Sequence, residues 1–381
     1  MSRLWYDSRL RAWLFQAGIL AAVVAVVGWL IGNTIDNLAL RGMKTGFDFL
    51  SDPARFPIAE TLIAYAPTDT YLRAFLVGLV NTVYISCVTI AAASVFGALV
   101  GISRRSANPV VSGMAGAYVE AFRNTPLVVQ LLFWYGMMTL SMPSPRAALE
   151  PLPGVFLSLR GLVLPWPLMN GTIQLAATVL GVGIVTALAA SALRRRAGDA
   201  ARRGWLSPAA VLLATALLAA AVAVIGGIDI SRPALSGFNF EGGATLTPEF
   251  TALMVGLILY TSAFIAEIVR GAIDAVPRGQ WEAGRAMGLR EHQILRLVIL
   301  PQALRIMVPP MTSQYLNVVK NTTLALAVGY PDFAAVVATT INQTSQSIEG
   351  VTILLLVYLT ISVSISLFMT WYNARVALVQ R

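Results

Sequence analysis

The side chains of this chain that could carry chemistry are few, and they exclude several kinds of active site. His292 is the only histidine and Cys87 the only cysteine, so a multi-histidine metal site and an internal disulfide are excluded. The only lysines, Lys44 and Lys320, do not follow a glycine, so the chain has no GxxxxGK[ST] loop for ATP. With one histidine, a Ser/His/Asp arrangement is not expected beyond chance. We predict a protein that is not an enzyme and has no catalytic residue, metal site or cofactor of its own.

Charged side chains are instead gathered in one stretch, 277–301, which lies between two hydrophobic segments. Its charged members are Arg278, Glu282, Arg285, Arg290, Glu291 and Arg296. Because a charge in hydrocarbon costs several kcal/mol, this stretch must face water. A short helix can run from about Arg278 to Met287 and end at Gly288, which tolerates left-handed backbone angles. A second short helix, apolar on one side, can follow, so we predict a rigid two-helix projection.

The composition indicates that the rest of the chain lies in a membrane. The chain has 381 residues, of which 57% are hydrophobic and 12% charged, and its mean hydropathy is +0.73. Soluble domains carry about a quarter charged residues. We therefore predict an all-α polytopic membrane protein in a lipid bilayer. Its net charge of +9 then reflects membrane topology, and no nucleic-acid partner is expected.

Eight apolar stretches are long enough to predict about eight transmembrane helices. Seven are continuous: 14–32, 74–102, 118–138, 172–193, 207–227, 247–271 and 351–372. The eighth begins after Pro301 and contains Arg305, Pro309 and Pro310, so we expect interrupted, irregular backbone there. Residues 1–71 then form an N-terminal transmembrane helix and an exterior loop, and 72–375 form the transmembrane domain.

The distribution of basic residues predicts the orientation. Arginines cluster at 104–105, 194–196 and 202–203 and in the charged stretch, whereas the loop at 33–70 has more acids than bases. Basic loops stay on the cytoplasmic side of a membrane. The eight-helix layout places these clusters inside, so we predict a multi-pass protein with both termini cytoplasmic.

Several polar residues lie within the predicted spans and are candidates for a pathway. They are Asn81, Thr82, Arg123, Thr125, Glu267, Lys320, Thr322 and Thr323. A polar side chain in a span usually bonds to a neighbouring helix, whereas a buried cation beside irregular backbone indicates a site or route. Lys320 is equally compatible with lining a substrate route and with a structural ion pair.

Four motifs resemble the permease subunits of ABC importers for amino acids. Glu282-Ala283-Gly284, then Gly288, then Leu300-Pro301 resemble the EAA loop, although Gly284 and Val298 replace the usual alanine and isoleucine. The strings YVEAFRNTPLVVQLLFWYG, AFIAEIVRGAI and VVKNTTLALAVGYPDF resemble the core helices of the same family. The resemblance covers about 72–140 and 245–375, so 141–246 would be an insertion carrying two extra helices on a type I permease core.

The resemblance implies a function and a set of partners. Glu282, Ala283, Gly284, Gly288, Leu300 and Pro301 would form the coupling loop, at 277–301, that seats on a separate ATPase carrying ATP and Mg²⁺. A second permease subunit, expected to be non-identical, would complete the path, and a periplasmic binding protein would deliver the substrate. The expected activity is import of L-amino acids of the general or acidic/amide type across the bacterial inner membrane by alternating access.

Two other classes of protein are weighed against this one. An ion-coupled secondary amino-acid transporter would also explain the polar segment near Lys320, but it would normally show an inverted repeat and buried acids for ion coupling. A non-transporting membrane scaffold leaves both the charged projection and the interrupted segment unexplained. Co-purification separates the first two, because only the ABC importer requires an ATPase partner.

Overall fold

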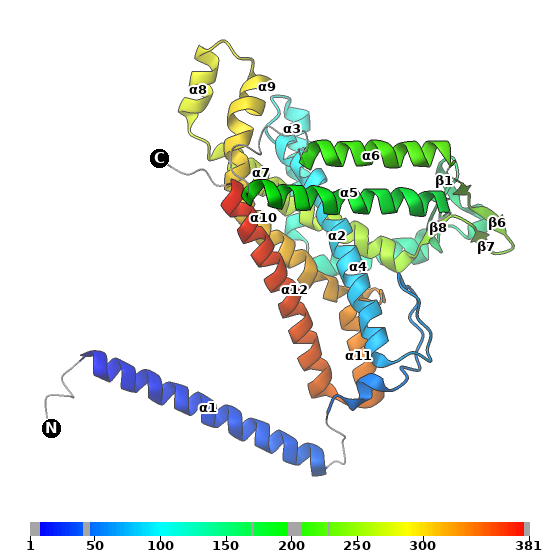
Figure 1. Cartoon of the computed structure of the whole chain (residues 1–381), viewed down its shortest axis with the longest axis vertical. Helices are drawn as coiled ribbons and strands as arrows, with labels where there is room; N and C mark the ends of the chain where they lie inside the picture. Colours follow the sequence, from blue (N-terminus) through cyan, green and yellow to red (C-terminus); the bar gives the residue numbers. More distant parts are fainter. Residues whose placement is uncertain (1–7, 41–45, 169–170, 197–207, 228, 377–381) are drawn as a thin grey trace. The chain divides into compact units, whose positions relative to one another are not determined.

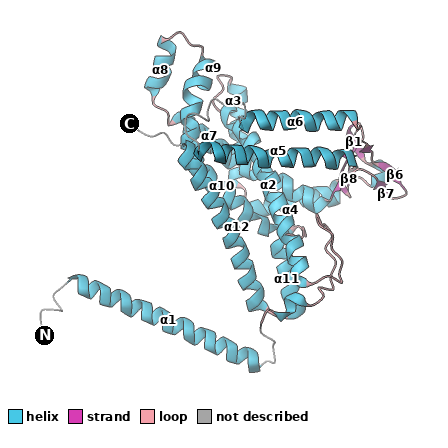
Figure 2. Cartoon of the chain, in the orientation of Figure 1, coloured by secondary structure: helices cyan, strands magenta, loops and turns pink. Residues whose placement is uncertain are grey.

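A computed structural model of the chain describes residues 8–40, 46–168, 171–196, 208–227 and 229–376. The predicted basic cluster at 202–203 and the first and last residues lie outside these ranges. The described part is mostly helical (Figure 2). It divides into two compact units, one of Met1–Pro126 with Leu257–Arg381 and one of Leu127–Gly256, and each is described by itself.

The first unit holds most of the long helices (Figure 1). Its α-helices, long and short, are α1 (Ser8–Leu40), α2 (Tyr71–Ser103), α3 (Pro109–Asn124), α8 (Arg278–Ala286), α9 (Glu291–Ile294), α10 (Leu300–Asn321), α11 (Phe333–Thr344) and α12 (Ser347–Val376), with the second half of α7 (Pro248–Asp274). Side-chain caps begin three of them. Thr70, Asn108 and Asp332 accept hydrogen bonds from the first-turn amides of α2, α3 and α11.

Five helical stretches of the described residues are long and apolar enough to cross a membrane. They are Arg11–Thr34, Tyr71–Ser103, Pro248–Asp274, Glu291–Ala327 and Ser347–Asn373. Shorter apolar helices occupy Leu127–Ser141, Gln174–Ala187 and Ala210–Val222. Every stretch predicted to span thus contains an apolar helix, while five meet the length needed for a span.

The prediction of an interrupted segment after Pro301 is wrong in its position. α10 stays helical through Pro309 and Pro310, although an interior proline removes a backbone hydrogen bond, and its packing against α2 and α12 supports it. The irregular backbone instead flanks α10, as a π-helical turn at Leu295–Ile299 and a 3-10 helix at Thr322–Ala327. α11, which is short and packs against α2 and α12, was not predicted from the sequence.

Glycines let α2 approach α7 closely. A Cβ added to Gly97 would lie 2.7 Å from Ile265, and one added to Gly101 would lie 2.6 Å from the carbonyl oxygen of Ala266. Small residues four apart allow such contact between membrane helices. The two helices therefore meet with almost no side chain between their backbones at these positions.

The exterior loop predicted at 33–70 is folded where it is described. Phe49 and Phe56 pack with Tyr71 and Phe75 of α2 in one buried apolar cluster, which also contains Phe333 of α11. The backbone amide of Gly46 donates to the carboxylate of Glu349, in the first turn of α12 (2.8 Å). This segment therefore joins the ends of three helices.

The second unit is a pair of helices with a small β-structure. α4 (Leu127–Gly136) leads through a π-helical turn at Met137–Ser141 into the strands, and α5 (Gly171–Arg196) and α6 (Pro208–Ile225) lie side by side (Figure 1). Gly183 makes room for Thr215 between them. The first half of α7 completes the unit.

The expectation of an all-α protein is corrected by this β-structure, which we call the β-cap (residues 145–167 and 230–246). Its strands are β1 (Leu149–Leu152), β2 (Val155–Ser158), β3 (Gly161–Leu164), β4 (Trp166–Pro167), β5 (Ile230–Ser231), β6 (Ala234–Ser236), β7 (Asn239–Glu241) and β8 (Ala244–Leu246). They form antiparallel sheets in the orders β1-β2-β3-β8, β4-β5 and β6-β7. The strands are two to four residues long, too short for an alternating pattern to reveal, and loops distant in sequence supply them.

Candidate coupling site and pathway residues

The charged projection is a hairpin of α8 and α9, which we call the α8–α9 hairpin (residues 278–299; Figure 1). Gly288 ends α8 with φ +73°, as predicted from its position. The amide of Leu289 donates to the carbonyl of Gly284 (3.1 Å), and that of Gly288 donates to the carbonyl of Arg285 (2.9 Å). This pair of bonds is the Schellman ending, which requires a left-handed residue where Gly288 stands.

α9 begins with its own local bonds. The backbone amide of Arg290 donates to the side chain of Gln293 (2.9 Å), and Glu291 forms an ion pair with Arg285 of α8 (2.7 Å). Both charged side chains of that pair are exposed, so the pair contributes little to stability. It does fix the charge pattern on the outer surface of the hairpin.

The two helices of the hairpin meet at Gly284. This glycine is buried, and a Cβ there would lie 2.9–3.1 Å from the side-chain carbons of Ile294, which is fully buried. Gly284 therefore serves the packing of α8 on α9. Glu282 and Ala283, its neighbours in the motif, are exposed on the other side of α8.

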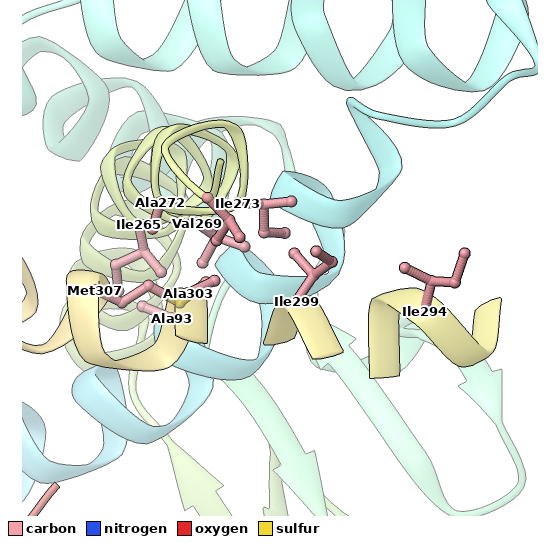
Figure 3. Close-up of a cluster of buried hydrophobic side chains, with 10 residues drawn as sticks. Ala93, Ile265, Val269, Ala272, Ile273, Ile294, Ile299, Ala303 and Met307 are labelled. Carbon is pink, nitrogen blue, oxygen red and sulfur yellow. The ribbon is translucent and has the colours of Figure 1, made fainter. Parts of the chain in front are cut away.

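A continuous apolar core joins the hairpin to the membrane helices. Ile294 and Ile299 belong to one buried cluster with Ala93 of α2, four α7 residues, and Ala303 and Met307 of α10 (Figure 3). Leu300 packs against this core and Pro301 is exposed at the start of α10. Gln302 of α10 also donates to Gln280 of α8 (3.1 Å). The hairpin, α7 and α10 therefore share one packed core.

A hollow of about 1030 Å³ lies beside the hairpin, lined by α8, α9, the end of α7 and the turn after α2. Arg105 forms an ion pair with Asp274 (3.2 Å) and its guanidinium lies 5.2 Å from the ring centre of Trp281 on α8. Glu282, Glu291 and His292 also face this hollow. The turn between α2 and α3 is thereby tied to α8.

Two of the predicted pathway residues form an ion-pair cluster. The carboxylate of Glu267 on α7 pairs with Arg104 of α2 and with Arg270, and Arg123 of α3 lies 3.8 Å from it. Arg270 also bonds to Asp274 (3.0 Å). Several guanidinium groups compensate this partly buried carboxylate, so the cluster ties α2, α3 and α7 together. Thr125 ends α3 and donates to the carbonyl of Ala121 (2.8 Å).

Three more predicted residues lie in a buried hydrogen-bond network. The side-chain amide of Asn81 donates to the carbonyls of Glu60 and Pro331 (both 2.9 Å), and Thr82 accepts from the amide of Phe333 (2.9 Å). Thr322 donates to the carbonyl of Val319 (2.8 Å) and is fully buried.

The same network holds a buried carboxylate. Asp332 is fully buried, and the hydroxyl of Tyr358 on α12 donates to it (3.1 Å). Buried polar groups that are bonded in this way fix the packing of α2, α11 and α12. None of these side chains faces outward in the described chain.

Lys320 and Thr323 lie differently. Lys320 is exposed, and it continues a line of exposed polar side chains on α10 that also contains Ser313 and Asn317, a set we call the polar stripe. These three residues make no side-chain hydrogen bond or ion pair with any other described residue. Thr323 is partly buried and donates to the carbonyl of Lys320 (2.8 Å). Sequence reasoning missed Ser313 and Asn317, although the steps of four residues from Ser313 to Asn317 and three from Asn317 to Lys320 are helical.

Comparison with known proteins places the chain in a family. Residues 93–378 match the family described as "Binding-protein-dependent transport system inner membrane component". YhdX of Escherichia coli (strain K12), named as a candidate amino-acid ABC transporter permease, is 46% identical over 97% of this chain and 95% of its own. The general L-amino acid transport system permease AapQ of Rhizobium johnstonii is 40% identical, over 99% of this chain and 94% of its own.

A third relative and a solved structure agree with this. The glutamate/glutamine/aspartate/asparagine transport system permease BztB of Rhodobacter capsulatus is 35% identical, over 100% of this chain and 97% of its own. The crystal structure of an amino acid ABC transporter with histidines has the same fold, with a TM-score of 0.50 and 19% identity over 80% of this chain and 95% of that one. The chain therefore belongs to the amino-acid ABC transporter permeases, the non-catalytic, multi-pass inner-membrane components of binding-protein-dependent transport systems.

Proposed function

We propose that this chain is the permease subunit through which an ABC importer takes up L-amino acids of the general or acidic/amide type. The observation that carries this is the α8–α9 hairpin, a rigid, charged projection packed into the helices of a chain of this family. The substrate class rests on relatives that align with nearly the whole chain and are named for general L-amino acids and for glutamate, glutamine, aspartate and asparagine.

Coupling to ATP would occur at the exposed side of α8. Glu282 and Ala283 would contact the ATPase subunit, which carries the ATP and Mg²⁺, and Gly288 would set the angle at which α8 meets α9. Gly284, Leu300 and Pro301 would not contact the ATPase. They would hold α8 in position by packing it against α9 and α10. Nucleotide-driven closure of the ATPases would then move α7 and α10 together and open the path to the other side.

The path itself would run along the polar stripe of α10. A polar face with an ammonium group cannot lie against hydrocarbon without large cost, so it must face water or another protein chain. Since the side chains of Lys320, Asn317 and Ser313 bond to no other described residue, a water-filled route at the contact with the second permease would satisfy them. Lys320 would attract the substrate carboxylate, and Thr323 lies one turn further. Asn81, Thr82, Thr322, Arg123, Thr125 and Glu267 would hold the helices around the route.

The charge distribution supports the proposed orientation in the membrane. Eight spans, with both termini cytoplasmic, place the arginines near 104, 194 and 285 on one side. Residues 1–71 and 141–246 would then be additions to a type I permease core. The second permease would be a different chain, and a binding protein would deliver substrate from the exterior.

The function is tested by purification and reconstitution. The tagged chain, extracted from its native membrane in mild detergent, should carry an ATPase subunit and a second permease, identified by mass spectrometry. In liposomes the complex should take up labelled glutamate or glutamine only with ATP and the binding protein. Uptake driven by an ion gradient, with no ATPase co-purifying, would identify a secondary transporter instead.

A further inference from the structure

The apolar core that the α8–α9 hairpin shares with α7 and α10 contains no described residue of α3. It reaches α2 at Ala93, and Ala98 packs on its border. The turn at 104–108 then leads from the end of α2 into the start of α3. A connection between the hairpin and α3 therefore has to be sought outside this core.

A chain of charged side chains runs from α3 to the end of α7, outside the core. Arg123 of α3 lies 3.8 Å from the carboxylate of Glu267, which also pairs with Arg270. Arg270 bonds to Asp274 (3.0 Å), and Asp274 pairs with Arg105 in the turn after α2 (3.2 Å). Each of the two carboxylates thus lies between two guanidinium groups, so the chain is continuous from α3 to Arg105.

The last contact of this chain reaches α8 through an aromatic ring. The guanidinium of Arg105 lies 5.2 Å from the ring centre of Trp281, within the distance at which a cation is attracted to a ring face. Trp281 is partly buried and packs on the border of the apolar core. Trp281 therefore contacts both the core and the charged chain.

Arg105 lies where the turn and the hairpin are otherwise separated. The hollow of about 1030 Å³ is lined both by the turn after α2 and by α8 and α9. Within the described residues, no hydrogen bond or ion pair joins the turn at 104–108 directly to α8. We call the contacts of Arg105 with Asp274 and Trp281 the Arg105 bridge.

The Arg105 bridge is weak enough to break during a transport cycle. The side chains of Arg105 and Asp274 are 31% and 44% exposed, so water screens their attraction. A cation over a ring is likewise held weakly at a site open to water. Contacts of this strength can be made in one state of a transporter and lost in the other, and such a difference biases the equilibrium between the two states.

We propose that Arg105 is a positioning residue for coupling, because it connects Trp281 of α8 to the turn that leads into α3. This rests on the function proposed above. The apolar core connects α8 to α7 and α10, and the Arg105 bridge connects it to α3. Without the bridge the ATPase subunits still hydrolyse ATP, but a smaller share of that hydrolysis drives import.

The test uses the complete complex in liposomes with its binding protein. It measures how many ATP molecules are hydrolysed for each molecule of labelled glutamate imported. Arg105→Ala and Trp281→Leu should each raise this ratio about two- to fivefold, the factor that corresponds to one exposed cation–π contact. The double variant should raise the ratio no further, since both changes remove the same contact.

Two variants separate positioning from a loss of stability. Trp281→Phe keeps an aromatic ring for Arg105 and should keep most of the coupling. Val110→Ala, at an exposed position at the start of α3, should leave the ratio unchanged. A variant that merely folds less well lowers hydrolysis and import together, so its ratio does not change.

The outcomes distinguish the bridge from the importer function itself. Unchanged ratios in Arg105→Ala and Trp281→Leu, beside a wild-type complex that imports with ATP, would overturn the bridge alone. Import by the wild-type complex without ATP would overturn the proposed function and the bridge with it.

A second measurement applies if a variant loses all transport. Nitroxide labels on Ala107→Cys and Gly279→Cys, with the other cysteines of the complex replaced, report the distance between the turn and α8. Both positions are exposed, and a side chain at Gly279 meets open space. The distance distribution should be narrow with Arg105 present and broader in Arg105→Ala. The same distribution in both would overturn the proposal.

Discussion

The α8–α9 hairpin and the polar stripe of α10 are both exposed surfaces of the first unit, yet they are built in opposite ways. The side of the hairpin that faces the membrane helices is packed. Gly284 contacts Ile294, and Ile294 belongs to a core shared with α2, α7 and α10. The stripe has no such support, since the side chains of Ser313, Asn317 and Lys320 bond to no other described residue. The packed core behind the hairpin suits a surface that transmits force. The unbonded polar side chains of the stripe suit a surface along which solute passes.

This difference separates the effects of mutations. Changes in the hairpin should uncouple ATP hydrolysis from transport for every substrate alike. Changes in the stripe should alter which substrates pass and at what concentration. The buried network around Asp332 supplies a third case. It is enclosed between α2, α11 and α12, so changes in it should affect stability alone.

The largest effect is expected at Gly288. Gly288→Val places a branched side chain at φ +73°, which costs about 1–2 kcal/mol and turns α8 away from α9. ATP-dependent import by the reconstituted complex should fall more than about tenfold. Gly288→Asn is the matched control, because asparagine tolerates left-handed angles and should keep most of the import. Equal rates for Gly288→Val and wild type would contradict the assigned role.

A smaller, selective effect is expected at Lys320. Lys320→Met keeps the length of the side chain but removes the charge that would meet the substrate carboxylate. A charge-assisted hydrogen bond is worth about 1.5–3 kcal/mol, so kcat/KM for uptake should fall about tenfold or more. Lys320→Arg should restore part of it. Should Lys320→Met import with unchanged KM and kcat, the stripe does not line the route.

The smallest effect on transport is expected at Tyr358. Tyr358→Phe removes the donor to the buried carboxylate of Asp332, which should lower the free energy of unfolding by about 1–3 kcal/mol. Thermal unfolding of the purified chain in detergent measures this. Tyr372→Phe, at an exposed position of α12, should leave the unfolding temperature unchanged. A shift in substrate selectivity in Tyr358→Phe would show that the buried network takes part in the route.

Local signals allowed much of the hairpin to be predicted. The ending of α8 at Gly288 follows from one glycine, and the water-facing position of 278–299 follows from its charges. Which faces of α8 and α9 meet depends on packing, so Gly284 could be read as a motif residue but not as the contact with Ile294.

Outside the hairpin, contacts between distant segments could not be predicted from the sequence. Polar residues in spans were identified, but their partners come from distant segments: Glu267 meets Arg104, and Asn81 meets the carbonyl of Glu60. The β-cap escaped prediction because its ladders join β3 to β8 across α5 and α6. The continuity of α10 through two prolines was missed because tertiary packing supports a helix that local propensity disfavours.

The coupling function requires that α8 touches the ATPase, and a cross-link from position 283 detects that contact. Ala283→Cys, made with Cys87→Ser to remove the native thiol, is labelled with a maleimide that carries a benzophenone, and the intact complex is illuminated so that the benzophenone inserts into a C–H bond of its neighbour. We expect a covalent product between this chain and the ATPase subunit, with a yield that changes when ATP is added. If the thiol at position 283 reacts with a water-soluble maleimide but yields no product with the ATPase, the coupling assignment is contradicted.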